Sequence, residues 1–226
     1  MTDAEITAAI AQAMEQPGSH GLADLVALRD RLQADRGPLA PALDPVWKAL
    51  VQVASRRHAD RDQRMELAEQ RARWLSAAHG PSDPETIRAW VELAFSADDD
   101  FDEPLAARAW EAVAAAPIDL DALPADVLPL VSQALRGLAS RRADARIDEA
   151  RRLFERDRAL QEKISPRGSP QLALSLENLA SLLEQLDERG PALDLRRRQR
   201  DALVAIGASR DQLDAVDAHI ARLRAR

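Results

Sequence analysis

Apolar-rich stretches of similar length alternate along the chain with short breaks that contain Pro, Gly or acidic residues. Each stretch is too short to be stable as an isolated helix, and the residues in the breaks favour helix ends, so the pattern predicts packed helices joined by short loops. The expected helices lie near residues 3–15, 21–36, 44–58, 61–78, 84–98, 103–115, 125–140, 146–164, 170–187, 190–206 and 209–225. Helices of such uniform length indicate an internal repeat.

A pair formed by an apolar residue and Ala recurs late in every second predicted helix. The pairs are Ile10-Ala11, Val53-Ala54, Leu93-Ala94, Leu138-Ala139 and Leu179-Ala180. A further Ala follows each pair in the next helix, at Ala23, Ala68, Ala106, Ala150 and Ala192. The residue three positions before each pair is large in every copy but the first; these residues are Thr7, Leu50, Trp90, Leu135 and Leu176. Antiparallel helices approach closely only where both present small side chains, so the pattern predicts helix pairs that cross at these alanines.

Composition changes this picture only by excluding sheets. The chain is 46% hydrophobic, yet it holds only 4 Trp, 3 Phe and no Tyr, and Ala and Leu supply most of its apolar residues. Aromatic and β-branched residues favour strands, whereas Ala, Leu, Arg and Glu favour helices. The predicted fold class is therefore all-α.

The repeat pattern resembles tetratricopeptide (TPR) repeats, and the longer repeats of the kinesin light chain kind in particular. Residues 79–94 and 169–183 carry the likeness, as do the Ala-to-aromatic steps from Ala106 to Trp110 and from Ala150 to Phe154. The resemblance implies one domain over residues 1–226, a right-handed α-solenoid of about five antiparallel helix pairs with a C-terminal capping helix. The pairs would lie near 3–36, 44–78, 84–115, 125–164 and 170–206, and the cap at 209–225. For residues 1–59 a HEAT-like stacking stays open, because the period also fits those repeats.

Sequence motifs for catalysis or cofactor binding are missing. The chain has no Cys, its 8 Gly are scattered singly, and its 4 His stand apart at positions 20, 58, 79 and 219. We therefore expect a non-catalytic protein without metal or cofactor. The sequence has no basic, apolar leader and no apolar stretch long enough for a membrane span, which predicts a cytoplasmic protein that does not bind membranes.

Charge favours a protein partner over nucleic acid. The net charge is −7, which argues against binding through phosphate neutralisation. Residues 1–113 carry 20 acidic and 12 basic side chains, and the run from Asp98 to Glu103 is the densest acidic segment. The run lacks the Gly and the terminal Glu of a calcium loop, so we expect it to attract a basic partner. Two predicted helices are rich in Arg, and their Arg side chains are expected to face solvent. These residues are Arg151, Arg152, Arg156 and Arg158 in one helix and Arg196, Arg197, Arg198 and Arg200 in the other.

The resemblance places partner binding on a concave groove built from the first helix of each pair. The positions that the register turns toward this groove are Gln52, Ser55, His58, Glu92, Phe95, Asp98, Asp99, Arg136, Ser140, Asn178, Ser181, Glu184 and Gln185. Asn178 stands where such repeats often carry an Asn that holds a peptide backbone, although a packing role stays open, as does a core position for Phe95. We expect a mainly acidic groove that binds a protein or peptide with a basic segment. The alternative is a structural or regulatory protein that self-associates through residues 1–36 and 209–226.

Overall fold

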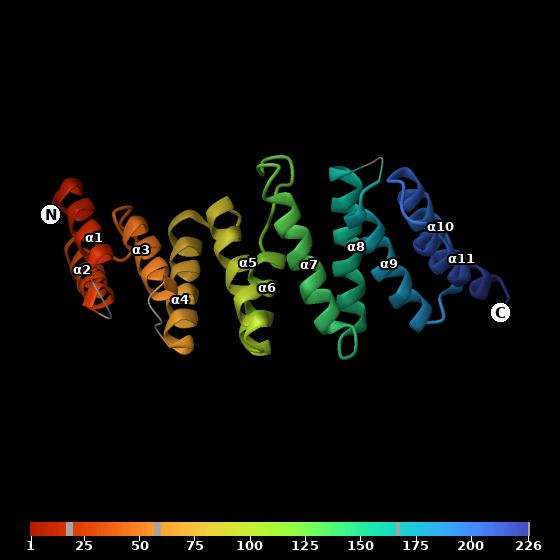
Figure 1. The fold of residues 1–226 in the computed structure, drawn as a ribbon, viewed down its shortest axis with the longest axis horizontal. Coiled ribbons are helices and arrows are strands. Elements are labelled where there is room, and N and C mark those ends of the chain that lie inside the picture. The colour runs from red at the N-terminus through yellow and green to blue at the C-terminus, as the bar shows by residue number, and fades with distance from the viewer. Residues whose placement is uncertain (17–19, 57–59, 166–167, 226) are drawn as a thin grey trace. The chain divides into compact units, whose positions relative to one another are not determined.

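The computed structural model describes residues 1–16, 20–56, 60–165 and 168–225, and this part of the chain forms eleven helices and no strands (Figure 1). The helices are α1 (Asp3–Glu15), α2 (His20–Arg36), α3 (Leu43–Arg56), α4 (Arg61–His79), α5 (Pro84–Asp99), α6 (Glu103–Ala114), α7 (Leu128–Arg142), α8 (Ile147–Ile164), α9 (Pro170–Gln185), α10 (Arg189–Ala205) and α11 (Arg210–Ala225). The predicted all-α fold is confirmed.

The helices form two compact units, residues 1–118 with α1 to α6 and residues 119–226 with α7 to α11. Within each unit every helix packs against the next one along the chain, and short loops make successive helices antiparallel. In the first unit α1 also contacts α3, so that neighbouring pairs stack on one another. Both units therefore have the consecutive helix packing of an α-solenoid.

Helix starts follow the polar caps in the sequence. The side chains of Thr2, Asp60, Asp83, Asp102 and Ser169 each accept hydrogen bonds from backbone N–H groups of the first turn. The largest error in the predicted boundaries is at α7, which begins at Leu128 and not near residue 125. A turn in which the Val127 N–H donates to the Pro124 carbonyl precedes this helix, and Pro129 lies in its first turn, where no N–H is needed.

The apolar-Ala pairs of the register are buried in four of the five helix pairs, and the register is wrong in the first. The second Ala is buried at Ala106, Ala150 and Ala192 and only half-buried at Ala68. Val53-Ala54, Leu93-Ala94, Leu138-Ala139 and Leu179-Ala180 are all buried. In the first pair Ala11 and Ala23 are exposed, and the small buried residue of α1 is Ala13. In α2 the buried residues are Gly21, Leu22, Leu25, Leu28 and Leu32, so the predicted Ala23 lies on the exposed face of this helix.

Because Ala139 is buried and Ala11 is exposed, replacing each of them by Leu should change the free energy of unfolding by different amounts. Ala139→Leu should destabilise the protein by about 1–3 kcal/mol, because Ala139 is fully buried where two helices meet. Ala11→Leu is the matched control and should change the free energy of unfolding by less than about 0.5 kcal/mol, because Ala11 is exposed. Urea unfolding of both variants measures the difference, and equal losses would contradict the packing described for α1.

Candidate functional site

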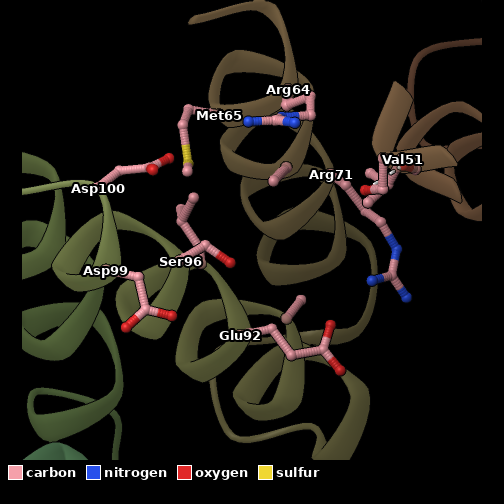
Figure 2. A pocket seen from close by; sticks show the side chains of 12 residues that line it. Val51, Arg64, Met65, Arg71, Glu92, Ser96, Asp99 and Asp100 are labelled. Carbon is pink, nitrogen blue, oxygen red and sulfur yellow. Dashed lines mark hydrogen bonds between the residues drawn. The ribbon is translucent and has the colours of Figure 1, made fainter. Parts of the chain in front are cut away.

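A cavity of about 500 Å³ lies between α3, α4 and α5 in the first unit (Figure 2). We call it the α3–α5 pocket. It is lined by Val51 and Ser55 of α3, by Arg64, Met65, Ala68 and Arg71 of α4, and by Ala89, Glu92, Leu93, Ser96, Asp99 and Asp100 at and after α5. Two first helices of neighbouring pairs form its walls, and a second helix lies between them.

Helical periodicity brings the polar lining residues together. Glu92, Ser96 and Asp99 are four and three residues apart on α5, and Arg64 and Arg71 are two turns apart on α4, so each set shares one helix face. Figure 2 shows Arg64 at the upper end of the pocket and Glu92 at the lower end. Apolar side chains also line the pocket, and Figure 2 shows one of them, Met65, beside Arg64.

Opposite charges line the α3–α5 pocket without pairing across it. The carboxylates of Glu92 and Asp99 and the guanidinium of Arg64 have no ion pair among the described residues. Arg71 is only 12% exposed, reaches Glu85 outside the pocket at 3.9 Å, and has a buried Nε atom without a hydrogen-bond partner in the described structure. The pocket thus combines free carboxylates with guanidinium groups that have donors to spare.

Of the predicted groove residues in the first unit, three line this pocket: Ser55, Glu92 and Asp99. Gln52 is exposed on α3 but does not line it, and His58 lies outside the described residues. Phe95 is 45% exposed and stacks edge-on against Trp110 of α6, with ring centroids 5.0 Å apart.

Asp98 holds the same tryptophan from the end of α5. Its carboxylate accepts a hydrogen bond from the Trp110 indole N–H at 3.2 Å. Asp98 is therefore a structural partner of α6, whereas the next residue, Asp99, lines the α3–α5 pocket.

In the second unit Arg136 belongs to a buried network between α7 and α8. Its guanidinium lies 3.3 Å from the carboxylate of Asp157 and donates to the Ser132 hydroxyl at 2.6 Å. Ser132 donates to Asp157 and accepts a hydrogen bond from Gln161 at 2.7 Å. Burial raises the pKa of the fully buried Asp157, although the charge of Arg136 and the hydrogen bond from Ser132 act in the opposite direction.

Two more predicted groove residues, Ser181 and Glu184, bind Arg196 of α10. Its guanidinium donates to Glu184 at 2.7 Å and to Ser181 at 2.9 Å. Burial acts to raise the pKa of Glu184, but the hydrogen bond and charge of Arg196, with a smaller contribution from His219, lower it overall.

The prediction that Arg196 faces solvent is wrong, because only 2% of it is exposed. Its long side chain turns toward α9, where Glu184 and Ser181 compensate for the loss of water around the charge. The neighbouring Arg197 and Arg198 are exposed, as predicted. One turn of an Arg-rich helix thus contributes both to the surface and to the core.

The remaining predicted residues of the second unit lie at its surface. Ser140 and Gln185 are exposed. Asn178 is half-buried on α9, and its amide has no hydrogen-bond partner among the residues that the structure describes. The structure therefore does not bring these three into one built site, and the role of Asn178 stays a prediction.

The sequence analysis missed Arg64, Met65 and Arg71, which come from a second helix of a pair. The signal was available as the two-turn spacing of the two arginines on the helix that follows Ser55. It also missed the partners of Arg136, namely Ser132, Asp157 and Gln161. A buried network of this kind has no local sequence signature, because its members come from two helices.

The described residues hold neither a group that could bind a metal ion nor a helix that could span a membrane. Residues 1–16, 20–56, 60–165 and 168–225 contain no group of three or more His, Asp or Glu side chains placed to hold a metal ion. None of the helices over the same ranges is long and apolar enough to cross a membrane.

Solved structures that share this fold include TPR-like repeat proteins. A putative kinesin light chain of Podosopora anserina, described as having nearly identical TPR-like repeats, is 17% identical to this chain, with a TM-score of 0.53 over 92% of this chain and 99% of the other. A variant of that protein is 19% identical, with a TM-score of 0.52 over 84% of this chain and 89% of the other. No protein-family model matches the sequence, and no curated protein matches it. The likeness shows a TPR-like α-solenoid fold, as the sequence predicted.

Proposed function

We propose that this protein is an interaction module that binds a segment of another protein at the α3–α5 pocket. The observation that carries the proposal is the pair of carboxylates, Glu92 and Asp99, which line a cavity of about 500 Å³ and have no ion pair with any residue that the structure describes. An unpaired charge at a partly enclosed site gains more from a ligand of opposite charge than one in open solvent does. The partner segment is therefore expected to carry a basic side chain.

The rest of the lining fits an extended peptide that carries such a side chain. The half-buried Val51 offers apolar surface for the aliphatic stem of Lys or Arg, whose charged end reaches the carboxylates, and Met65 adds a small exposed part. Arg64 and Arg71 lie on the intervening helix and have only N–H donors, which suit the carbonyl oxygens of a peptide backbone. TPR-like folds commonly bind peptides or proteins, which supports this assignment at the level of the fold.

A double substitution tests the proposal. Glu92→Gln combined with Asp99→Asn keeps the size of both side chains and removes both charges, so partner binding should weaken at least about tenfold. The measurement is capture of proteins from the native lysate on the immobilised chain, at low and at high salt, followed by mass spectrometry and titration of the captured protein. Binding by the unchanged chain should weaken as salt rises.

The matched control is Glu15→Gln combined with Asp35→Asn, which removes two exposed carboxylates of the first unit outside the pocket. This control should keep the captured proteins. Asp98 is left unchanged because its loss would disturb Trp110. If the pocket variant captures the same proteins with the same affinity as the unchanged chain, the assignment of the pocket is wrong.

A further inference from the structure

Phe101 is the most exposed aromatic residue of the described chain. Its side chain is 91% exposed, whereas the four Trp residues and Phe154 are buried and Phe95 is partly covered by Trp110. Phe101 follows the C-terminus of α5 and lies between Asp100 and Asp102. A phenyl ring that stays in water contributes no free energy of burial to folding. The position of the Phe101 ring therefore needs an explanation other than packing.

The backbone at Phe101 is also unfavourable for this residue type. Its φ of 59° is left-handed, a region that bulky residues rarely occupy. The turn is closed by hydrogen bonds from the Phe101 N–H to the Asp98 carbonyl at 3.1 Å and from the Asp102 N–H to the Ala97 carbonyl at 2.8 Å. This is the hydrogen-bond pattern of a helix that ends in a left-handed residue, where Gly or Asn is usual.

The same turn occurs at the end of α9 with a different residue. Asp187 has a φ of 57°, and the N–H groups of Asp187 and Glu188 donate to the carbonyls of Glu184 and Leu183, at 3.2 and 2.9 Å. Asp tolerates this conformation well. The fold therefore does not need an aromatic residue at this turn. Phe101 exposes an apolar ring to water and places a bulky residue in the left-handed region, and Asp187 avoids both costs.

The turn presents the Phe101 ring in a fixed place. Arg61 of α4 lies 3.3 Å from the Asp100 carboxylate and donates to the Asp100 carbonyl at 2.8 Å, and it reaches Asp102 at 3.9 Å. Asp99 and Glu103 lie two residues before and two residues after Phe101 in the sequence, and both are exposed and have no ion pair among the described residues. An exposed ring beside free carboxylates matches the chemistry of a cation with a flat or aliphatic surface.

We infer that Phe101 is a docking anchor for an Arg or Lys side chain of the partner segment. The cation lies over the ring face while Asp99 and Glu103 accept its N–H donors. The inference rests on the proposed function in that both require a basic segment. Asp99 connects the two surfaces, because it lines the α3–α5 pocket and precedes Phe101 by two residues.

Substitution at Phe101 should change binding and stability in opposite directions. The probe is a short fluorescein-labelled peptide that alternates Arg and Ala, with affinity measured by fluorescence anisotropy on the full chain. Phe101→Asn removes the ring and favours the left-handed backbone, so affinity should fall roughly two- to fivefold while the melting temperature rises by about 2–4 °C. Phe101→Trp keeps a ring and should bind at least as tightly as the unchanged chain.

Leu39→Asn is the control for loss of an exposed apolar side chain outside the turn, and it should leave the affinity unchanged. Equal affinity of the unchanged chain and of Phe101→Asn overturns the anchor, even where the Glu92 and Asp99 double variant binds more weakly and so supports the pocket. If Phe101→Asn binds the peptide more weakly while the Glu92 and Asp99 double variant binds as tightly as the unchanged chain, the result supports the anchor and counts against the pocket. If the unchanged chain binds the peptide no better than a peptide that alternates Gln and Ala, both proposals are overturned.

Discussion

Arg136→Met is expected to destabilise the protein by about 3–5 kcal/mol at neutral pH, because it leaves the fully buried Asp157 without its counter-charge. Arg136 is the only cation that contacts this carboxylate among the described residues. The remaining hydrogen bond from Ser132 does not replace a full charge. Urea unfolding followed by circular dichroism measures the loss.

The loss should depend on pH in a defined direction. Burial raises the folded-state pKa of Asp157, so the folded state favours the protonated carboxyl group. The contribution of this group to stability is complete below its ordinary pKa and is lost as the pH rises through the raised pKa. Removal of Arg136 raises the pKa further, and the effect of Arg136→Met should therefore shrink as the solution becomes more acidic.

A second substitution separates the charge from the packing. Combining Arg136→Met with Asp157→Asn removes the buried charge, keeps an oxygen that accepts from Ser132, and should recover at least half of the lost free energy at neutral pH. A loss that is the same at neutral and acidic pH, with no recovery in the double variant, would contradict the ionic role of Arg136.

Trp110→Ala should cost about 3–5 kcal/mol, because it empties a buried site between α5 and α6. It also removes the surface against which the Phe95 ring packs and the donor that the Asp98 carboxylate accepts. Phe95 and Asp98 would then lose their fixed positions beside the α3–α5 pocket. Thermal unfolding and urea unfolding both report the loss.

Trp110→Phe is the matched variant for the indole N–H. It keeps a ring for the contact with Phe95, but it removes the hydrogen bond to Asp98 and part of the buried ring volume, so the cost should be about 1–3 kcal/mol. A cost for Trp110→Ala no greater than that for Trp110→Phe would show that the packing described for the α5–α6 pair is wrong.

The helices were predictable because their signals are local. A cap such as Ser169 or Asp83 and a Pro in the first turn act on the backbone of adjacent residues, and both are visible in the sequence. The alanine register was predictable for the same reason in four pairs. It was wrong in the first pair because the leucines of α2, from another helix, decide which face of α1 is buried.

The candidate site was predictable only in part. Periodicity along α5 was enough to select Glu92 and Asp99. It could not show that Arg64 and Arg71 approach from α4, since that depends on how three helices pack. For the same reason it could not separate Asp98, which holds Trp110, from Asp99, which is free.

The sequence by itself determined the helices, most of their bounds, the small residues at four crossings and the all-α repeat class, because each depends on short-range backbone chemistry and on helical period. Only the tertiary structure decided which charges are paired. Arg136, Ser181, Glu184 and Arg196 carry the same polar groups as residues at the surface, but contacts between helices pair them, and Arg196 is also buried. Glu92, Asp99 and Phe101 are exposed, and within the described residues neither carboxylate has an ion pair.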